Sequence, residues 1–122
     1  MVHRELVPDV NGLEFALWLL GRRQRLQVSG NSMLPLLRPG DEVLVNFRVY
    51  RDRSPVEGEI VVARHPHQPG VKIVKRVIAV LEDGRFILMG DNKGESTDSR
   101  HFGSVALAQI AGKVVSLFAR KH

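Results

Sequence analysis

The chain has 122 residues, a formal net charge of +5 and no cysteine. This length suits one compact domain with a single core, and the absence of cysteine excludes disulfides, thiolate nucleophiles and cysteine-bound metals. The positive charge suits an acidic partner. However, the basic residues are dispersed and the chain has only one Trp, one Tyr and five Phe, so a role in nucleic-acid binding has weak support.

The N-terminal part predicts one helical segment, over residues 9–21, which Asp9 caps and Gly21 ends. The longest apolar run, residues 15–20, is far shorter than the ~20 residues that a bilayer span needs. The first residues also lack the basic start and apolar core of a secretory signal. We therefore expect a cytoplasmic location and a helix docked on the domain. Contact of this helix with a membrane or a partner is a second interpretation, because arginines follow it at positions 22–25.

Residues 26–118 predict a β-domain, because short apolar and β-branched runs alternate with Gly- and Pro-containing turns. The run over residues 71–81 is the longest and predicts a central strand, which the Asp83-Gly84 turn joins to the next. A polar loop over residues 90–104 follows, and loops of this length are usually functional or disordered. The expected fold is mainly β, with an N-terminal helix, in one domain over residues 1–122. The expected strands cover residues 26–28, 42–47, 59–64, 71–81, 85–89 and 112–118.

Two residues are candidates for chemistry. Ser32 lies in a bend rich in Gly, Asn and Pro between two expected strands, where unpaired backbone N–H groups can hold an oxyanion beside a nucleophile. Lys75 shares one strand face with Ile73 and Val77 by alternation. Burial there would lower the pKa of the amine by ~3–5 units and allow it to take a proton from a serine.

The sequence gives little support for a metal site. His65 and His67 flank a proline in a turn, and two histidines alone rarely complete a metal shell. The oxygen-rich loop at Asp91 has a lysine, Lys93, where a calcium loop needs an oxygen ligand. We therefore expect no metal and no other cofactor. Whether the two histidines handle nickel stays open.

Four ordered segments together resemble the type I signal peptidases, a family of Ser/Lys proteases that share a catalytic fold with LexA-type repressors. The resemblance covers residues 28–115 and implies a signal-peptidase-like catalytic domain of short antiparallel strands. The segments are Ser32-Met33-Leu34-Pro35 with Pro39-Gly40-Asp41, then Gly58-Glu59-Ile60-Val61-Val62, then Lys75-Arg76-Val77-Ile78, and finally residues 90–103, which begin Gly90-Asp91-Asn92.

The resemblance also implies residue roles. Ser32 is the nucleophile and Lys75 the general base, and Ser96 orients that lysine. Substrate binds as an added β-strand in a groove that Met33 and Pro35 help to form. Some family members have a serine two residues before the nucleophile as an oxyanion donor. Here that residue is Gly30, so Asn31 is a candidate replacement and Asn31→Ala a more informative variant than Ser29→Ala. The implied oxyanion and supporting residues are Gly30, Asn31, Ser96, Asp98, Arg100, Asp91 and Arg76, with Asp91 paired to Arg76 and Asp98 to Arg100.

The segment before the serine indicates a branch of the family. Residues 17–23, read with the serine segment, look like the proteases that mature nickel-type superoxide dismutase by removing an N-terminal propeptide. We therefore expect a serine endopeptidase whose partner is a protein substrate, the precursor of a nickel superoxide dismutase. We expect no nucleic-acid partner. A general signal-peptidase-I-like processing protease is one alternative. A small basic β-module that binds nucleic acid or protein without catalysis is an alternative of another class.

Overall fold

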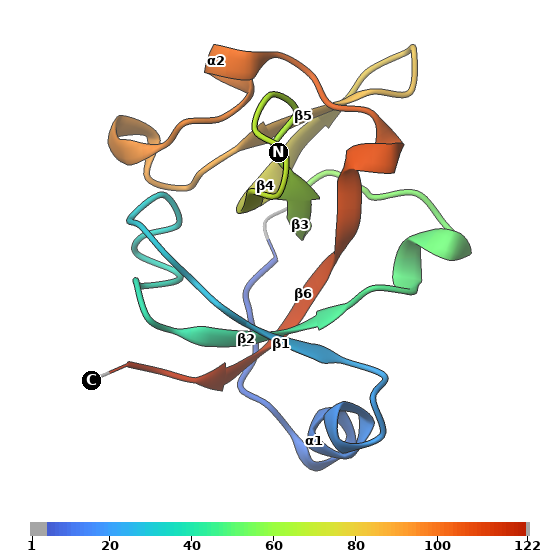
Figure 1. The fold of residues 1–122 in the computed structure, drawn as a ribbon, viewed down its shortest axis with the longest axis vertical. Helices are drawn as coiled ribbons and strands as arrows, with labels where there is room; N and C mark the ends of the chain where they lie inside the picture. The colour runs from blue at the N-terminus through green and yellow to red at the C-terminus, as the bar shows by residue number, and fades with distance from the viewer. Residues whose placement is uncertain (1–4, 122) are drawn as a thin grey trace.

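The computed structural model describes residues 5–121 and contains a single six-stranded antiparallel sheet (Figure 1). The strand order is β1-β2-β6-β3-β4-β5. This confirms the expected mainly β fold of antiparallel strands with an N-terminal helix. The elements are α1 (Gly12–Leu19), β1 (Gln24–Gln27), β2 (Glu42–Asn46), η1 (Val49–Arg51), β3 (Ile60–Arg64), β4 (Lys72–Val80), β5 (Phe86–Met89), η2 (Lys93–Glu95), α2 (Ser99–Phe102), η3 (Leu107–Gln109) and β6 (Ile110–Ala119).

The long strand β6 joins two halves of the sheet. It pairs with β2 along one edge and with β3 along the other, so β1 and β2 form the lower half and β3, β4 and β5 the upper half in Figure 1. Strand β3 is buried on both faces, because Ile60 and Val62 enter one hydrophobic cluster while Val61 and Ala63 enter the other. This explains why β3 is continuously apolar rather than alternating.

The N-terminal helix is shorter than residues 9–21, and its cap is Asn11 rather than Asp9. The Asn11 side-chain oxygen accepts a hydrogen bond from the Glu14 N–H at 2.8 Å, which is the usual N-cap contact. Asp9 lies instead in an isolated bridge with Leu117 of β6. Asp and Asn both cap helices well. Asp9 pairs with β6, however, so Asn11 caps the helix.

Strand β1 also differs from the prediction, because it begins at Gln24 and ends at Gln27. Its residues are mostly exposed, and it lies at the edge of the sheet, paired with β2 alone. Because three of its four residues are exposed, this edge strand shows no apolar alternation, and the prediction missed its polar first half.

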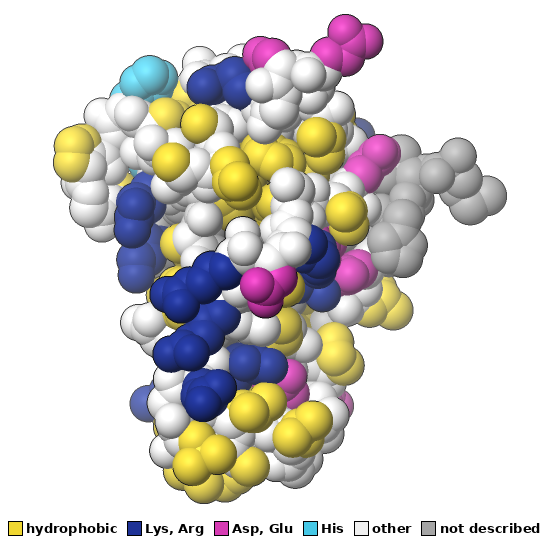
Figure 2. All heavy atoms as spheres, turned by 90° about the vertical axis from the view of Figure 1, so that its right-hand side faces the viewer, with side chains coloured by type: hydrophobic (Ala, Val, Ile, Leu, Met, Phe, Trp, Pro, Cys, Tyr) yellow, Lys and Arg dark blue, Asp and Glu magenta, His cyan; other side chains and the backbone are white. Residues whose placement is uncertain are grey.

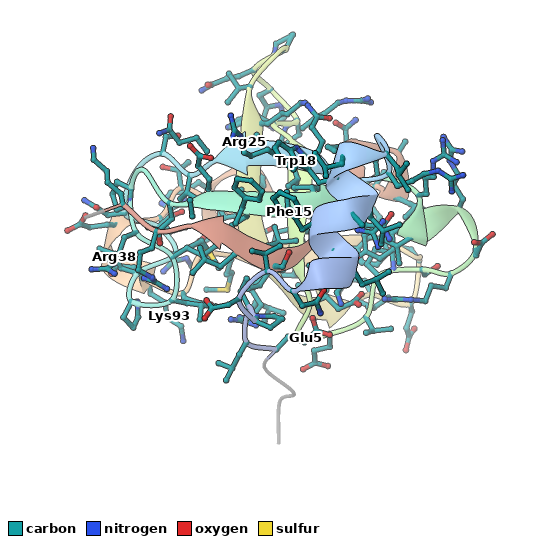
Figure 3. All side chains as sticks on the ribbon, turned by 90° about the horizontal axis from the view of Figure 1, so that it is seen from below. Glu5, Phe15, Trp18, Arg25, Arg38 and Lys93 are labelled. Atoms are coloured by element: carbon teal, nitrogen blue, oxygen red, sulfur yellow. The ribbon has the colours of Figure 1, made fainter. Side chains whose placement is uncertain are left out.

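Helix α1 contacts the lower end of the sheet through aromatic side chains. Phe15 and Trp18 point from the helix toward the sheet (Figure 3) and lie 6.3 Å and 4.6 Å, between ring centroids, from Phe118 of β6. The Arg25 guanidinium lies 5.7 Å from the Trp18 ring. No residue of α1 is fully buried. Within residues 5–121, no helix has the length and apolar content needed to cross a membrane.

Candidate active site

Ser32 lies in the bend between β1 and β2, and contacts on two sides hold it. Gly30 has a φ of +74°, which favours glycine at this point of the bend. On one side, Met33 is 1% exposed and packs in the core. On the other side, the Asn92 N–H donates to the Ser32 carbonyl oxygen at 2.8 Å, and the Asn92 side chain donates to the Asn31 carbonyl at 3.1 Å. The Ser32 N–H has no hydrogen-bond acceptor within the described residues. It therefore meets the requirement for an oxyanion donor.

Lys75 lies in β4, opposite Val61 of β3, and is only 4% exposed. Its Nζ donates a hydrogen bond to Ser96 Oγ at 2.9 Å. Burial lowers the pKa of Lys75 because the charged amine loses hydration. The Asp98 carboxylate opposes this shift, and the Arg100 guanidinium adds to it. The net direction favours the neutral amine, which is the form that accepts a proton.

Ser96 is oriented by its own partners. Its hydroxyl donates to Asp98 Oδ2 at 2.6 Å and accepts from the Gly90 N–H at 3.2 Å. Burial acts to raise the pKa of Asp98, but hydrogen bonds from Arg100, Ser96 and the Gly90 amide outweigh it and hold the pKa well below its usual range. Because the Ser96 proton goes to this ionised carboxylate, Ser96 can only accept from Lys75. A neutral Lys75 therefore keeps its lone pair for another partner.

One cavity of about 360 Å³ brings the two candidate catalytic residues together. Among the described residues, no hydrogen bond joins Ser32 Oγ to Lys75; such contacts are often loose in an unliganded site and tighten with substrate. The cavity is lined by Ser32, Lys75 and Met33, with Leu26, Gln27, Val28, Ser29, His65, Gln68, Val71, Lys72, Ile73, Val74 and Thr97.

Two strand edges border this cavity without a neighbouring strand. Strand β5 pairs with β4 only from Arg76 onward, so the first half of β4 has β3 on one side and no strand on the other. Strand β1 pairs with β2 alone. Residues 26–28 and 71–75 from these two regions line the cavity. Unpaired backbone groups on such edges can hydrogen-bond an extended peptide.

The pair Arg76 and Asp91 lies on the other face of β4. Arg76 Nε and Nη2 donate to the two Asp91 carboxylate oxygens at 2.8 Å and 2.9 Å, and Arg76 Nη1 donates to the Gly58 carbonyl at 2.7 Å. Pro35 lines a second cavity, of about 340 Å³, beside this pair rather than the cavity of Ser32. Of the two residues expected in the substrate groove, Met33 therefore lines the Ser32 cavity and Pro35 does not.

Asn31 and Arg100 brace the loop from residue 90 to 98. The Asn31 side-chain amide donates to Glu95 at 2.9 Å, whereas Ser29, and not Asn31, lines the Ser32 cavity. Arg100 Nε donates to Asp98 Oδ1 at 2.9 Å. In this arrangement Asn31 connects the serine bend to the loop.

The sequence interpretation gave no role to Ser29, Thr97 or Gly90. Ser29 and Thr97 line the cavity, and Gly90 donates its N–H to both Ser96 and Asp98. Isolated serines and threonines carry no periodic signal, so only their position next to the recognised segments could have marked them. In residues 5–121, no three His, Asp or Glu side chains gather as a metal site.

Comparison with known proteins identifies the family. The family described as "Signal peptidase, peptidase S26" matches residues 15–81 and 80–119. The chain belongs to this family. This confirms the expected family, the signal-peptidase-like serine endopeptidases.

The chain is similar to proteases of the mitochondrial inner membrane. It is 35% identical over 105 residues to mitochondrial inner membrane protease subunit 1 of Xenopus tropicalis. The matched region covers 70% of this chain and 63% of that relative. It is 36% identical over 105 residues to subunit 2 of Mus musculus, covering 69% of this chain and 60% of the relative. Signal peptidase I of Aquifex aeolicus (strain VF5) is 38% identical over 56 residues, which cover 46% of this chain and 22% of that protein. The chain thus spans less than two thirds of the length of these relatives.

These names correct one expectation. The expected cytoplasmic location was wrong, because the relatives are named for an inner membrane. The error came from treating the lack of a membrane-spanning run as evidence of location, although a protein can lie on a membrane without crossing it. None of these relatives is named for nickel superoxide dismutase maturation.

Proposed function

We propose that this chain is a processing endopeptidase in which Ser32 is the nucleophile and Lys75 the general base. The observation that carries the proposal is the buried Lys75, which is hydrogen-bonded to Ser96 and shares one cavity with Ser32. Lys75 has a lowered pKa and a fixed orientation, and Ser32 lies in a bend with an N–H available for an oxyanion. The site therefore holds a nucleophile, a general base and an oxyanion donor, the three components that acyl transfer by a serine requires.

In the proposed reaction, the neutral Lys75 amine takes the Ser32 hydroxyl proton as Oγ forms a bond with the scissile carbonyl carbon. The Ser32 N–H stabilises the resulting oxyanion. The C–N bond then breaks, and Lys75 gives its proton to the leaving amine. Water, deprotonated by Lys75, attacks the acyl-enzyme ester and releases the new carboxyl end, and the proton returns to Ser32 Oγ.

The proposed substrate is a protein with a removable N-terminal extension, bound as a strand between residues 26–28 and 71–75. Within this class we propose the precursor of a nickel superoxide dismutase. This proposal rests on the resemblance of residues 17–23 and the serine segment to the proteases that mature that enzyme. The names of the relatives support a second candidate, a precursor presented at a membrane.

The catalytic roles can be tested with single variants and matched controls. Ser32→Ala and Lys75→Ala should each reduce peptide cleavage by at least about a thousandfold, because each removes a component of one reacting unit. Ser54→Ala and Lys93→Ala alter exposed side chains outside the cavity and should keep normal activity. Substantial cleavage by Ser32→Ala or Lys75→Ala would refute the Ser/Lys assignment.

The substrate can be tested separately. Incubation with a nickel superoxide dismutase precursor should produce one new N-terminus, which mass spectrometry can locate, and Ser32→Ala should leave the precursor intact. If the enzyme cleaves other precursors and leaves this one intact, the substrate proposal fails while the peptidase proposal survives. Retention of nucleic acid at moderate salt, with no cleavage of any precursor, would favour a non-catalytic binding module instead.

A further inference from the structure

The cavity of Ser32 is lined by basic residues and by no acidic one. Lys72, Lys75 and His65 all line it, and none of its lining residues is Asp or Glu. Burial favours the neutral form of Lys75, whereas Lys72 is exposed to solvent. The ammonium group of an exposed lysine is a compact, hydrated point charge. Lys72 therefore gives one end of the cavity a positive charge.

A second cation lies beside Lys72. Arg64 of β3 is directly opposite Lys72 of β4, and opposite residues point to the same face of a sheet. Two residues further along, the opposite residues Val62 and Val74 pack in the hydrophobic cluster that contains Met33. Because residues two apart share a face, Arg64 and Lys72 lie on the Met33 side of the sheet. We refer to Arg64 and Lys72 as the basic pair.

No acidic side chain neutralises the basic pair. Within residues 5–121, neither Arg64 nor Lys72 has a carboxylate at ion-pair distance. The Lys72 Nζ lies instead 5.8 Å from the centre of the Phe47 ring. Like charges directly opposite each other destabilise a sheet, so their charges do not contribute to the stability of the fold. An anionic group bound between them would offset this repulsion.

The wider surface also attracts anions. Figure 2 shows a band of Lys and Arg side chains on one face of the molecule, with few Asp or Glu side chains among them. The formal net charge of the chain is +5. A positive surface of this kind speeds the approach of an acidic partner.

We propose that the basic pair binds an acidic side chain of the substrate and that Lys72 is a specificity-determining residue. This inference rests on the proposed function, in which the substrate lies as a strand between residues 26–28 and 71–75. Lys72 precedes Lys75 by three residues in β4, which is about 10 Å at about 3.3 Å per residue. An extended substrate advances by the same distance per residue. The acidic side chain is therefore on the third or fourth residue from the cut bond.

The test uses a set of peptides that spans the N-terminal region of the nickel superoxide dismutase precursor. Within the set, Glu or Gln is placed at one position at a time, and mass spectrometry locates the cut bond. Wild type should cleave the Glu peptide with a kcat/KM about fivefold above that of the Gln peptide when the exchange is at the third or fourth residue on one side of the cut. This ratio should fall as salt is added.

Variants of the basic pair separate a role in specificity from a role in the fold. Lys72→Gln should bring the Glu-to-Gln ratio to about one, whereas loss of a merely structural contact would slow both peptides alike. Lys72→Glu should reverse the preference, so that a peptide with Lys at this position is cleaved faster than the Glu peptide. Arg64→Gln should lower the ratio by about twofold. Lys93→Gln makes the same change at an exposed lysine outside the cavity and should keep the wild-type ratio. Thermal melting checks that each variant is folded.

A binding measurement distinguishes failure of this inference from failure of the proposed function. Ser32→Ala is mixed with the same peptides, and binding is followed by fluorescence anisotropy. A Glu preference in binding, without cleavage by wild type, would refute the peptidase and keep the acidic subsite. Cleavage without a Glu preference at any position, or a preference that survives in Lys72→Gln, would overturn the acidic subsite alone. Neither cleavage nor binding of any peptide would overturn both.

Discussion

Substitution of Gly90 by alanine tests whether the loop after β5 holds the nucleophile and the base together. Gly90 donates its N–H to Ser96 Oγ at 3.2 Å and to Asp98 Oδ2 at 3.1 Å. A methyl group at this position would lie 2.5 Å from the Ser32 carbonyl oxygen and would also overlap the Ser96 side chain. The Ser32 contact is with backbone, so no flexible side-chain end can move away to relieve it.

The size of the expected effect follows from these contacts. A carbon and an oxygen that do not hydrogen-bond lie about 3.5 Å apart, so the alanine must displace the Ser32 backbone, Ser96 or itself by about 1 Å. Crowding of this kind costs about 1–3 kcal/mol, partly offset by about 0.4–1 kcal/mol from the stiffer unfolded chain. A shift of about 1 Å in a catalytic group costs on the order of 100-fold in rate. We therefore expect Gly90→Ala to lower kcat/KM by about 100-fold and Tm by only about 5–10 °C.

Gly94→Ala is the matched control. Gly94 lies in the same loop, and nothing lies within 4 Å of the position that its methyl group would occupy. The assay is peptide cleavage under conditions in which both variants remain folded, as shown by thermal melting. A kcat/KM for Gly90→Ala within about threefold of wild type would refute the crowding argument. An equal loss in Gly94→Ala would assign the effect to loop stiffness rather than to contact with Ser32 and Ser96.

Two further predictions concern charge. Because burial lowers the pKa of Lys75 and the neutral amine is the proposed base, kcat/KM should rise with pH and level off below the ordinary lysine value of 10.5. Arg100→Gln should move this rise to higher pH, because the Arg100 cation lowers the pKa of Lys75. Asp98→Asn should move it to lower pH, because the Asp98 carboxylate raises that pKa. Shifts of both variants in the same direction would contradict this. Glu59→Gln should reduce the free energy of unfolding at neutral pH by about 1–2 kcal/mol, because the buried carboxylate accepts hydrogen bonds from Arg53 at 3.0 Å and 2.5 Å. Burial acts to raise the pKa of Glu59, but these contacts hold it below 4.5, so its stabilising effect is present above that pH and is lost as pH falls. Urea unfolding should therefore show the variant and wild type converging in acid, and a constant difference would contradict this.

The sheet and the burial of Lys75 follow from a pattern that strands obey closely. Side chains in a strand alternate between faces, so Ile73, Lys75 and Val77 share one side whatever lies next to the strand. The structure leaves Lys75 4% and Val77 0% exposed. Helix caps and edge strands follow weaker local rules. Asp9 and Asn11 are both good caps, and only the contact with β6 decides between them.

Contacts of the serine bend lay beyond sequence reasoning because they cross long sequence separations. Asn31 was a candidate oxyanion donor by its position before Ser32. Its amide instead donates to Glu95, 64 residues away. Any exposed carboxylate in the loop could have been that partner. No local pattern distinguishes among such partners, because the fold alone brings the bend and the loop together.

One loop supports both halves of the proposed dyad. The Asn92 N–H holds the Ser32 carbonyl at 2.8 Å, and Ser96 holds Lys75 at 2.9 Å, with only three residues between these two loop positions. The Gly90 amide, two residues before Asn92 in the same loop, donates to Ser96 and Asp98 and so ties the start of the loop to the residue that holds Lys75. The position of the nucleophile and that of the base therefore cannot vary independently. A substitution that moves this loop should change the pH at which activity appears together with the maximal rate, whereas a substitution that affects Ser32 alone should change only the rate.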